Sequence, residues 1–125
     1  MENVSLEKRI IRFLMENITE PQLNVNSIAK ELKKNRSYIF RIVIKQCNCS
    51  PQRLIETKRI TLALELLSKG EKVIYTAIKT GFVNGYNLRR AFKKRLGITP
   101  SDFKEKCCKA ENIEDVLNDF KRILK

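Results

Sequence analysis

The chain repeats itself, and this repeat limits the folds open to it. A shift of 49 residues brings Asn35 onto Asn84 and Arg41 onto Arg90. Upstream of the two asparagines the shift drops to 48, so the second copy has one extra residue in its turn. Further matched pairs are Ile39 with Leu88, Val43 with Phe92, Lys45 with Lys94, Cys47 with Leu96, and Ser50-Pro51 with Thr99-Pro100.

Each copy has the pattern of a short helix, a tight turn and a second helix that begins at an asparagine cap. Asn35 is expected to cap a helix over 36–46, and Asn84 one over 85–96. Ala29 and Ala77 lie in the preceding short helices, where a small side chain lets two helices cross closely. The repeat therefore predicts two helix-turn-helix units, although two helical hairpins that only pack together would show the same pattern.

The remaining segments also have helical periodicity. A first helix is expected over 6–18 and ends before Pro21, and a long helix over 51–68 opens with Ser50-Pro51. Apolar residues on several sides of the long helix fit a bridge between two units. We expect an all-α chain with these segments: 1–49, first subdomain; 50–70, linker helix; 71–109, second subdomain; 110–125, C-terminal amphipathic helix.

The composition favours a polyanionic partner and argues against an enzyme. The 125 residues hold 26 Lys and Arg against 14 Asp and Glu, a net charge of +12. Such a field concentrates polyanions and promotes contacts with phosphate. The chain lacks histidine, the commonest general base, and shows neither a phosphate-binding glycine loop nor a convergent pair of carboxylates. We expect no enzyme activity, no cofactor and no metal.

The expected outer faces of the two capped helices point to DNA. On the second, Tyr86, Arg90 and Lys93 lie opposite the apolar face, with Arg89 beside them. Long cationic donors on the helix after a capped turn can reach guanine edges and phosphates. The first capped helix instead turns Ser37, Phe40, Arg41 and Ile44 outward, and its apolar side chains could contact thymine methyl groups or another protein.

Together these residues resemble the DNA-binding domain of the AraC/XylS family of bacterial regulators. The resemblance covers about residues 10–106 and is strongest in the second half. The first half departs from the family pattern, with Lys33 and Asn48 at positions where glycine is usual. Thr76 stands where an aliphatic residue is expected. The matching residues are Ala77, Gly81-Phe82, Asn84, Leu88, Arg90, Phe92-Lys93-Lys94, Gly97, Thr99-Pro100-Ser101 and Phe103.

The resemblance implies seven helices, with the third and sixth entering successive major grooves of double-stranded DNA. It also implies a transcription regulator, most often an activator that contacts RNA polymerase, of the short, stand-alone type. The candidate base-proximal residues are Arg36, Ser37, Phe40, Arg41, Tyr86, Asn87, Arg89 and Arg90. The candidate phosphate contacts are Lys45, Lys93 and Lys94, and the candidate helix caps are Asn35 and Asn84.

Several alternatives remain open at this stage. The chain could be the DNA-binding module of a larger or hetero-oligomeric regulator, with the helix over 111–124 contacting a second copy or another protein. The thiols of Cys47, Cys49, Cys107 and Cys108 could make it redox- or metal-responsive, although C-x-C and C-C are not the usual zinc spacings. With no apolar run long enough to cross a membrane, we expect a cytoplasmic, nucleoid-associated bacterial protein.

Overall fold

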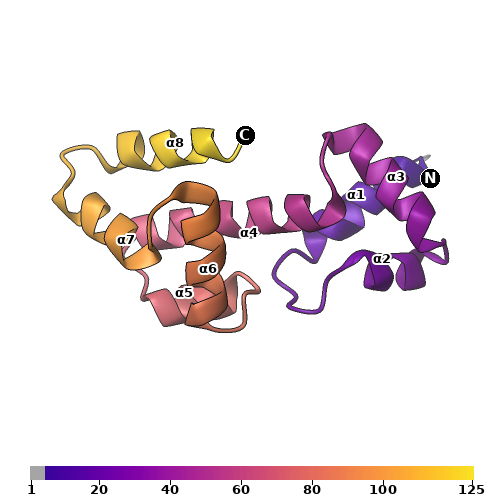
Figure 1. Cartoon of the computed structure of the whole chain (residues 1–125), viewed down its shortest axis with the longest axis horizontal. Helices are drawn as coiled ribbons and strands as arrows, with labels where there is room; N and C mark the ends of the chain where they lie inside the picture. Colours follow the sequence, from indigo (N-terminus) through magenta and orange to yellow (C-terminus); the bar gives the residue numbers. More distant parts are fainter. Residues whose placement is uncertain (1–4) are drawn as a thin grey trace, which may run out of the picture. The chain divides into compact units, whose positions relative to one another are not determined.

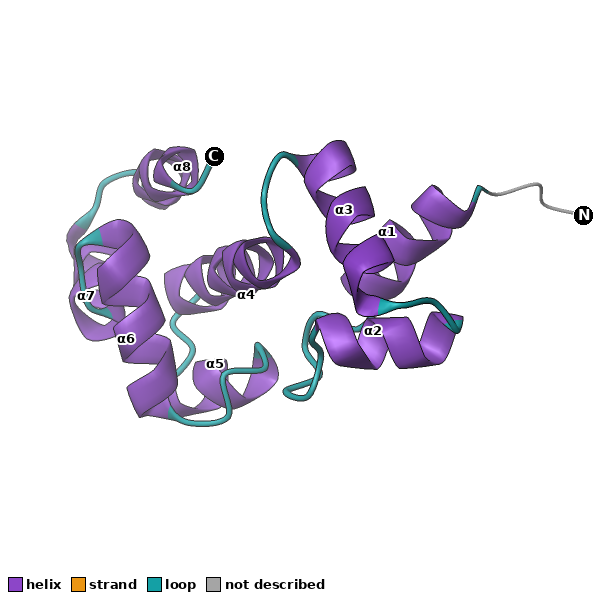
Figure 2. Ribbon diagram, turned by 45° about the vertical axis from the view of Figure 1, so that its right-hand side comes forward, coloured by secondary structure: helices purple, strands orange, loops and turns teal. Residues whose placement is uncertain are grey.

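The structure is a computed structural model that describes residues 5–125, and this part of the chain contains eight α-helices and no strand (Figures 1 and 2). The expectation of an all-α fold is confirmed. The helices are α1 (Leu6–Glu16), α2 (Val25–Leu32), α3 (Arg36–Cys47), α4 (Pro51–Ser68), α5 (Val73–Lys79), α6 (Gly85–Leu96), α7 (Pro100–Lys109) and α8 (Ile113–Ile123).

The chain divides into two compact units, Met1–Glu56 and Thr57–Lys125, and α4 runs from the first into the second. In the first unit, α3 packs against both α1 and α2. Apolar residues recur at helical spacing in these helices, so each helix buries one apolar face in the core of the unit. The most deeply buried of them are Ile10, Leu14, Ile28, Ile39 and Val43.

Two turns of the first unit use left-handed backbone where the family pattern has glycine. Lys33 ends α2 with φ of 55°, and Asn48 ends α3 with φ of 58°. Asn tolerates this region better than most residues, whereas Lys does so at a conformational cost. The Lys34 amide donates to the Ala29 carbonyl across the end of α2, which closes the helix in the manner of a Schellman turn. The chain thus keeps the tight turn without glycine.

The second unit encloses one core formed by α4 to α8. Phe92 of α6 and Phe103 of α7 lie at its centre, with ring centroids 5.9 Å apart. Other fully buried side chains are Ile60, Leu64, Leu67, Ala77 and Leu88.

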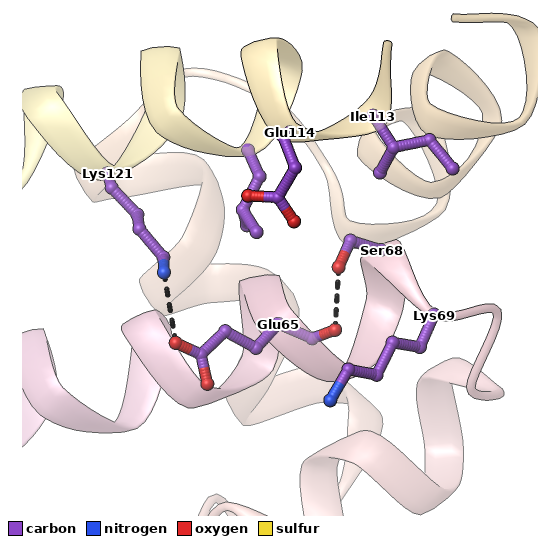
Figure 3. A pocket seen from close by; sticks show the side chains of 7 residues that line it. Glu65, Ser68, Lys69, Ile113, Glu114 and Lys121 are labelled. Atoms are coloured by element: carbon purple, nitrogen blue, oxygen red, sulfur yellow. Dashed lines mark hydrogen bonds and ion pairs between the residues drawn. The ribbon is translucent and has the colours of Figure 1, made fainter.

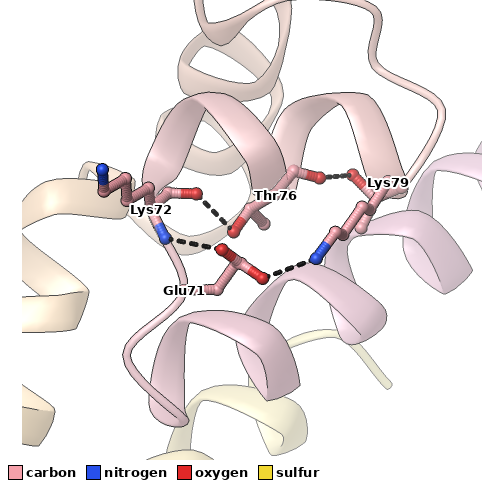
Figure 4. Close-up of polar contacts among 5 residues, drawn as sticks. Glu71, Lys72, Thr76 and Lys79 are labelled. Atoms are coloured by element: carbon pink, nitrogen blue, oxygen red, sulfur yellow. Dashed lines mark hydrogen bonds and ion pairs between the residues drawn. The ribbon is translucent and has the colours of Figure 1, made fainter.

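The N-terminal part of α5 is held by polar contacts (Figure 4). Thr76 is fully buried, and its hydroxyl donates to the Lys72 carbonyl at 2.9 Å. A threonine can therefore stand where an aliphatic residue is expected, because its own helix accepts its proton. The Glu71 carboxylate accepts from Lys79 Nζ at 2.7 Å and from the Lys72 amide at 3.2 Å.

The C-terminal helix α8 packs on the second unit. Leu117 and Leu124 are buried in its core, and Lys121 pairs with Glu65 of α4 at 3.0 Å beside a groove of about 430 Å³ (Figure 3). Part of the predicted apolar stripe lies outside the contact: Ile113 is 41% and Ile123 is 55% exposed. The helix is thus a structural part of this unit with a partly apolar outer surface.

Several helix boundaries differ from expectation by one or two residues: α3 extends to Cys47, and α8 spans Ile113–Ile123 within the expected 111–124. The first helix ends at Glu16, not Ile18, because the Asn17 side-chain amide donates to the Phe13 carbonyl and closes the helix there. Ile18 is nevertheless buried. The seventh helix, expected over 101–108, runs from Pro100 to Lys109, and proline is favoured at the first position of a helix. The division into four segments stays a prediction. None of the helices within residues 5–125 is long and apolar enough to cross a bilayer.

Candidate nucleic-acid interface

Both candidate recognition helices begin at an asparagine that accepts a backbone hydrogen bond. Asn35 Oδ1 accepts from the Tyr38 amide at 2.8 Å, and Asn84 Oδ1 accepts from the Asn87 amide at 2.8 Å. The caps satisfy an amide that the first turn would otherwise leave unpaired. They also set the angular position of every later side chain on the helix, so matched residues of the repeat take matched places relative to the cap.

The outer face of α6 is cationic and aromatic. Arg89, Arg90 and Tyr86 are exposed, whereas Leu88, Ala91, Phe92 and Leu96 are buried. The Arg90 guanidinium carbon lies 5.7 Å from the centre of the Tyr86 ring, a cation–π arrangement. Asn87 is exposed, but its amide nitrogen donates to the Phe82 carbonyl at 3.1 Å. That bond ties the side chain of Asn87 to the turn before α6.

The outer face of α3 is less charged and more apolar. Arg36, Ser37 and Arg41 are exposed, and Phe40 and Ile44 are each 41% exposed. Two large apolar side chains next to an arginine on one exposed helix face are unusual for a surface in contact only with water. They provide apolar area of the kind that a thymine methyl group or another protein can cover.

The candidate phosphate contacts differ in their surroundings. Lys94 is exposed at the C-terminal half of α6. Lys93 is also exposed and donates through Nζ to the Gly97 carbonyl at 3.3 Å. Lys45 pairs with Glu7 of α1 at 3.3 Å, and the Gln46 side chain donates to the same carboxylate. A phosphate contact by Lys45 would have to compete with Glu7, so Lys94 is the strongest of the three candidates.

One residue of this surface, Tyr38, is not among the candidates that the sequence predicts. Tyr38 is half-buried, and the Arg41 guanidinium carbon lies 5.5 Å from its ring centre. An aromatic residue three positions before an arginine on a helix is the signal that predicts such a contact.

None of the four cysteines, all within residues 5–125, forms a disulfide in the structure. Cys47 and Cys49 are half-buried at the junction of α3 and α4. Cys107 is buried and Cys108 exposed, and burial, with a smaller contribution from Cys108, raises the pKa of the Cys107 thiol. Within residues 5–125, no group of three or more His, Cys, Asp or Glu side chains is placed to hold a metal ion. A thiol-based response stays a prediction.

Two capped helices, each following a tight turn and presenting exposed arginines, define a protein with two helix-turn-helix units. Residues 28–106 match a family model described as a helix-turn-helix domain. The chain belongs to this AraC-type family of DNA-binding domains, whose members are transcription regulators and not enzymes.

Two relatives show how the match is distributed. The Msm operon regulatory protein of Streptococcus mutans is 32% identical over 84 residues, which cover 66% of this chain and 30% of that protein. The regulatory protein SoxS of Salmonella typhimurium is 25% identical over 107 residues, covering 85% of this chain and 99% of SoxS. The chain thus spans less than a third of the Msm regulator and nearly all of SoxS.

Solved structures share the fold. The C-terminal domain of AraT, a response regulator from Geobacillus stearothermophilus, superimposes with a TM-score of 0.77 at 22% identity, covering 84% of this chain and 88% of that one. The DNA-binding domain of AdpA, crystallised with a target DNA, superimposes with a TM-score of 0.76 at 20% identity. The match covers 87% of this chain and 100% of the AdpA domain. Both likenesses concern the fold.

Proposed function

We propose that this chain regulates transcription by inserting α3 and α6 into successive major grooves of one DNA duplex. The observation that carries the proposal is the exposed Arg89 and Arg90 on the capped helix α6. Arginine can donate two hydrogen bonds to the edge of guanine, which is the commonest specific contact in the major groove. The net charge of +12 supplies the attraction for phosphate that does not depend on sequence.

Two observations support the assignment of individual residues. The exposure of Arg36, Ser37, Phe40 and Arg41 on α3, and of Tyr86, Asn87, Arg89 and Arg90 on α6, is what base contacts require. Because both helices begin at a matched cap, Asn35 or Asn84, matched residues take the same angular position around the two helix axes. If the two hairpins only packed together and bound no DNA, these faces would not need to be exposed to solvent.

The two helices differ in chemistry, and we propose that they read different bases. Phe40 and Ile44 of α3 are suited to the methyl groups of thymine, and the arginines of α6 to guanine. Base-by-base substitution within the bound site would then show one half sensitive to loss of thymine methyls and the other to loss of guanine. Equal sensitivity of both halves to G·C replacement would contradict this asymmetry.

The test of the proposed function is selection of duplexes from a random pool by the purified chain. We expect enrichment of one sequence whose two conserved segments lie about one helical turn, roughly 34 Å, apart. The Arg90→Ala variant, selected in parallel, should lose the preference in one segment only. Recovery of no preferred sequence by the unmodified chain would refute the proposal.

We further propose that the regulator is an activator that contacts RNA polymerase. Support comes from the outer surface of α8, where Ile113 remains exposed beside the acidic first turn of Glu114 and Asp115, and Ile123 remains exposed in the basic last turn. A transcription assay on the selected site compares the unmodified chain with a variant carrying Ile113→Ser and Ile123→Ser. We expect the variant to bind DNA normally but to activate less, and equal activation by both would count against this surface.

A further inference from the structure

The two candidate recognition helices share an arrangement that the repeat alone does not require. In each, the arginine six positions after the capping asparagine lies over a tyrosine ring of the same helix. Arg41 lies over Tyr38, three residues before it, and Arg90 lies over Tyr86, four residues before it. The matched arginines thus have tyrosines at unmatched positions, and both distances fall within the range of a cation–π contact.

We infer that Tyr38 and Tyr86 are positioning residues that hold Arg41 and Arg90 for base recognition. The inference rests on the proposed function and assigns a role to side chains that need not touch a base themselves. Residues three and four apart lie next to each other on a helix surface, so either spacing brings a ring beneath the arginine. Different sequences thus reach one geometry in the two units.

The physical reason lies in the side-chain entropy of arginine. A free arginine samples many rotamers, and binding a base edge in one geometry removes that freedom. A ring under the guanidinium restricts the side chain before DNA arrives, and the planar guanidinium keeps its edge donors available while one face stacks. Pre-organisation of this kind raises affinity by lowering the ordering cost of binding.

Tyr86 allows the sharper experiment, because the residue is 57% exposed and its replacement should leave the fold intact. Tyr86→Leu removes the ring face and keeps an apolar side chain, and Tyr86→Phe keeps the face and removes the hydroxyl. The probe is the duplex selected by the unmodified chain. We expect Tyr86→Leu to bind it about two- to fivefold more weakly and Tyr86→Phe to bind within about twofold of the unmodified chain.

A double-mutant cycle separates positioning from direct contact. If Tyr86 acts through Arg90, then Tyr86→Leu should cause no further loss when it is added to Arg90→Ala. Replacing the contacted guanine by 7-deazaguanine should lower the DNA affinity of the unmodified chain more than it lowers the affinity of the Tyr86→Leu variant. The reason is that the variant already holds Arg90 less well. If the ring had a purely structural role, the loss from Tyr86→Leu would not depend on Arg90, and 7-deazaguanine would lower the affinity of both proteins equally.

The outcomes distinguish the inference from the proposed function. Failure of the unmodified chain to select any sequence would refute the function and the inference together. Specific binding by the unmodified chain, combined with an equal loss from Tyr86→Leu in the presence and absence of Arg90, would overturn the inference alone. A loss from Tyr86→Phe as large as that from Tyr86→Leu would also overturn it, because the hydroxyl and not the ring face would then be needed.

Discussion

The ring of Phe120 in α8 meets the ring of Phe103 in α7 edge to face, with 5.2 Å between their centroids. Phe103 is fully buried between this ring and that of Phe92, so α8 covers an aromatic residue at the centre of the second unit. Edge-to-face pairs are a favoured geometry and add to the free energy of simple burial. The contact makes the C-terminal helix part of the folded unit.

Phe120→Ala should therefore lower the free energy of unfolding by about 2 kcal/mol. This is less than truncation of a fully buried phenylalanine costs, because Phe120 is only half-buried. Denaturant unfolding followed by circular dichroism measures the change. Ile123→Ala is the matched control on the same helix, and its exposed side chain should change the stability by no more than about 0.5 kcal/mol. Equal effects of the two variants would show that α8 does not cover the core.

Val83→Asn should stabilise the chain by about 0.5–1 kcal/mol. Val83 has φ of 75° in the turn before α6, a region that a β-branched side chain enters only with strain, whereas asparagine tolerates it. Its side chain is 57% exposed, so little packing is lost. Thermal unfolding measures the gain. Val83→Thr keeps the branch at Cβ and should bring none, and a gain of the same size would contradict the strain account.

Stability should decline in acid partly through Glu71. Its hydrogen bond from Lys79, then that from the Lys72 amide, lowers the pKa of Glu71. A carboxylate whose pKa is lower in the folded state than in the unfolded state stabilises the fold. This contribution to the free energy of unfolding is complete above the unfolded pKa, about 4.3, and is lost as the pH falls through the folded pKa. Glu71→Gln should flatten the pH dependence of unfolding in this range, and Lys79→Gln should do so too. An unchanged pH profile in both variants would contradict the assignment.

Arg90→Ala should weaken binding to the selected duplex by about 1–3 kcal/mol and affect unrelated DNA much less. A base-edge contact distinguishes sequences, whereas a phosphate contact does not. Fluorescence anisotropy at fixed salt, with both DNAs, measures the difference. Arg122→Ala on α8 removes the same charge outside the proposed interface and should leave specific binding unchanged. If Arg90→Ala behaved like Arg122→Ala, α6 would not be the recognition helix.

Lys94→Ala should weaken binding to all DNA sequences and reduce the slope of log K against log salt by about one. The slope reports the number of phosphates neutralised, so it tests the contact without knowledge of the operator. Titrations at several salt concentrations provide it, with Lys125→Ala as the control that removes one exposed charge at the C-terminus. An identical drop in slope for both variants would make the effect one of net charge alone.

Most of the helix order could be read from local signals. Asn35, Asn84 and Thr99 cap helices within a few residues of themselves, and Gly70 and Gly97 follow helix ends with positive φ. Each signal acts over one turn of backbone and is visible in the printed sequence. Helical periodicity likewise separated Leu88 and Phe92, which are buried, from Arg89 and Arg90, which are exposed.

Contacts between distant residues were decided only by the tertiary structure. The pairing of Lys45 with Glu7, the cover that Phe120 gives to Phe103, and the exposure of Ile113 and Ile123 within an apolar stripe all depend on how helices pack. The stacking of Arg41 on Tyr38 has a local signal in its spacing of three residues, but it also depends on the rotamers that neighbouring side chains select. Propensity and capping act between neighbours along the chain, so the helices follow from the residue order. Burial and charge pairing act across space, so these contacts follow from how the helices pack.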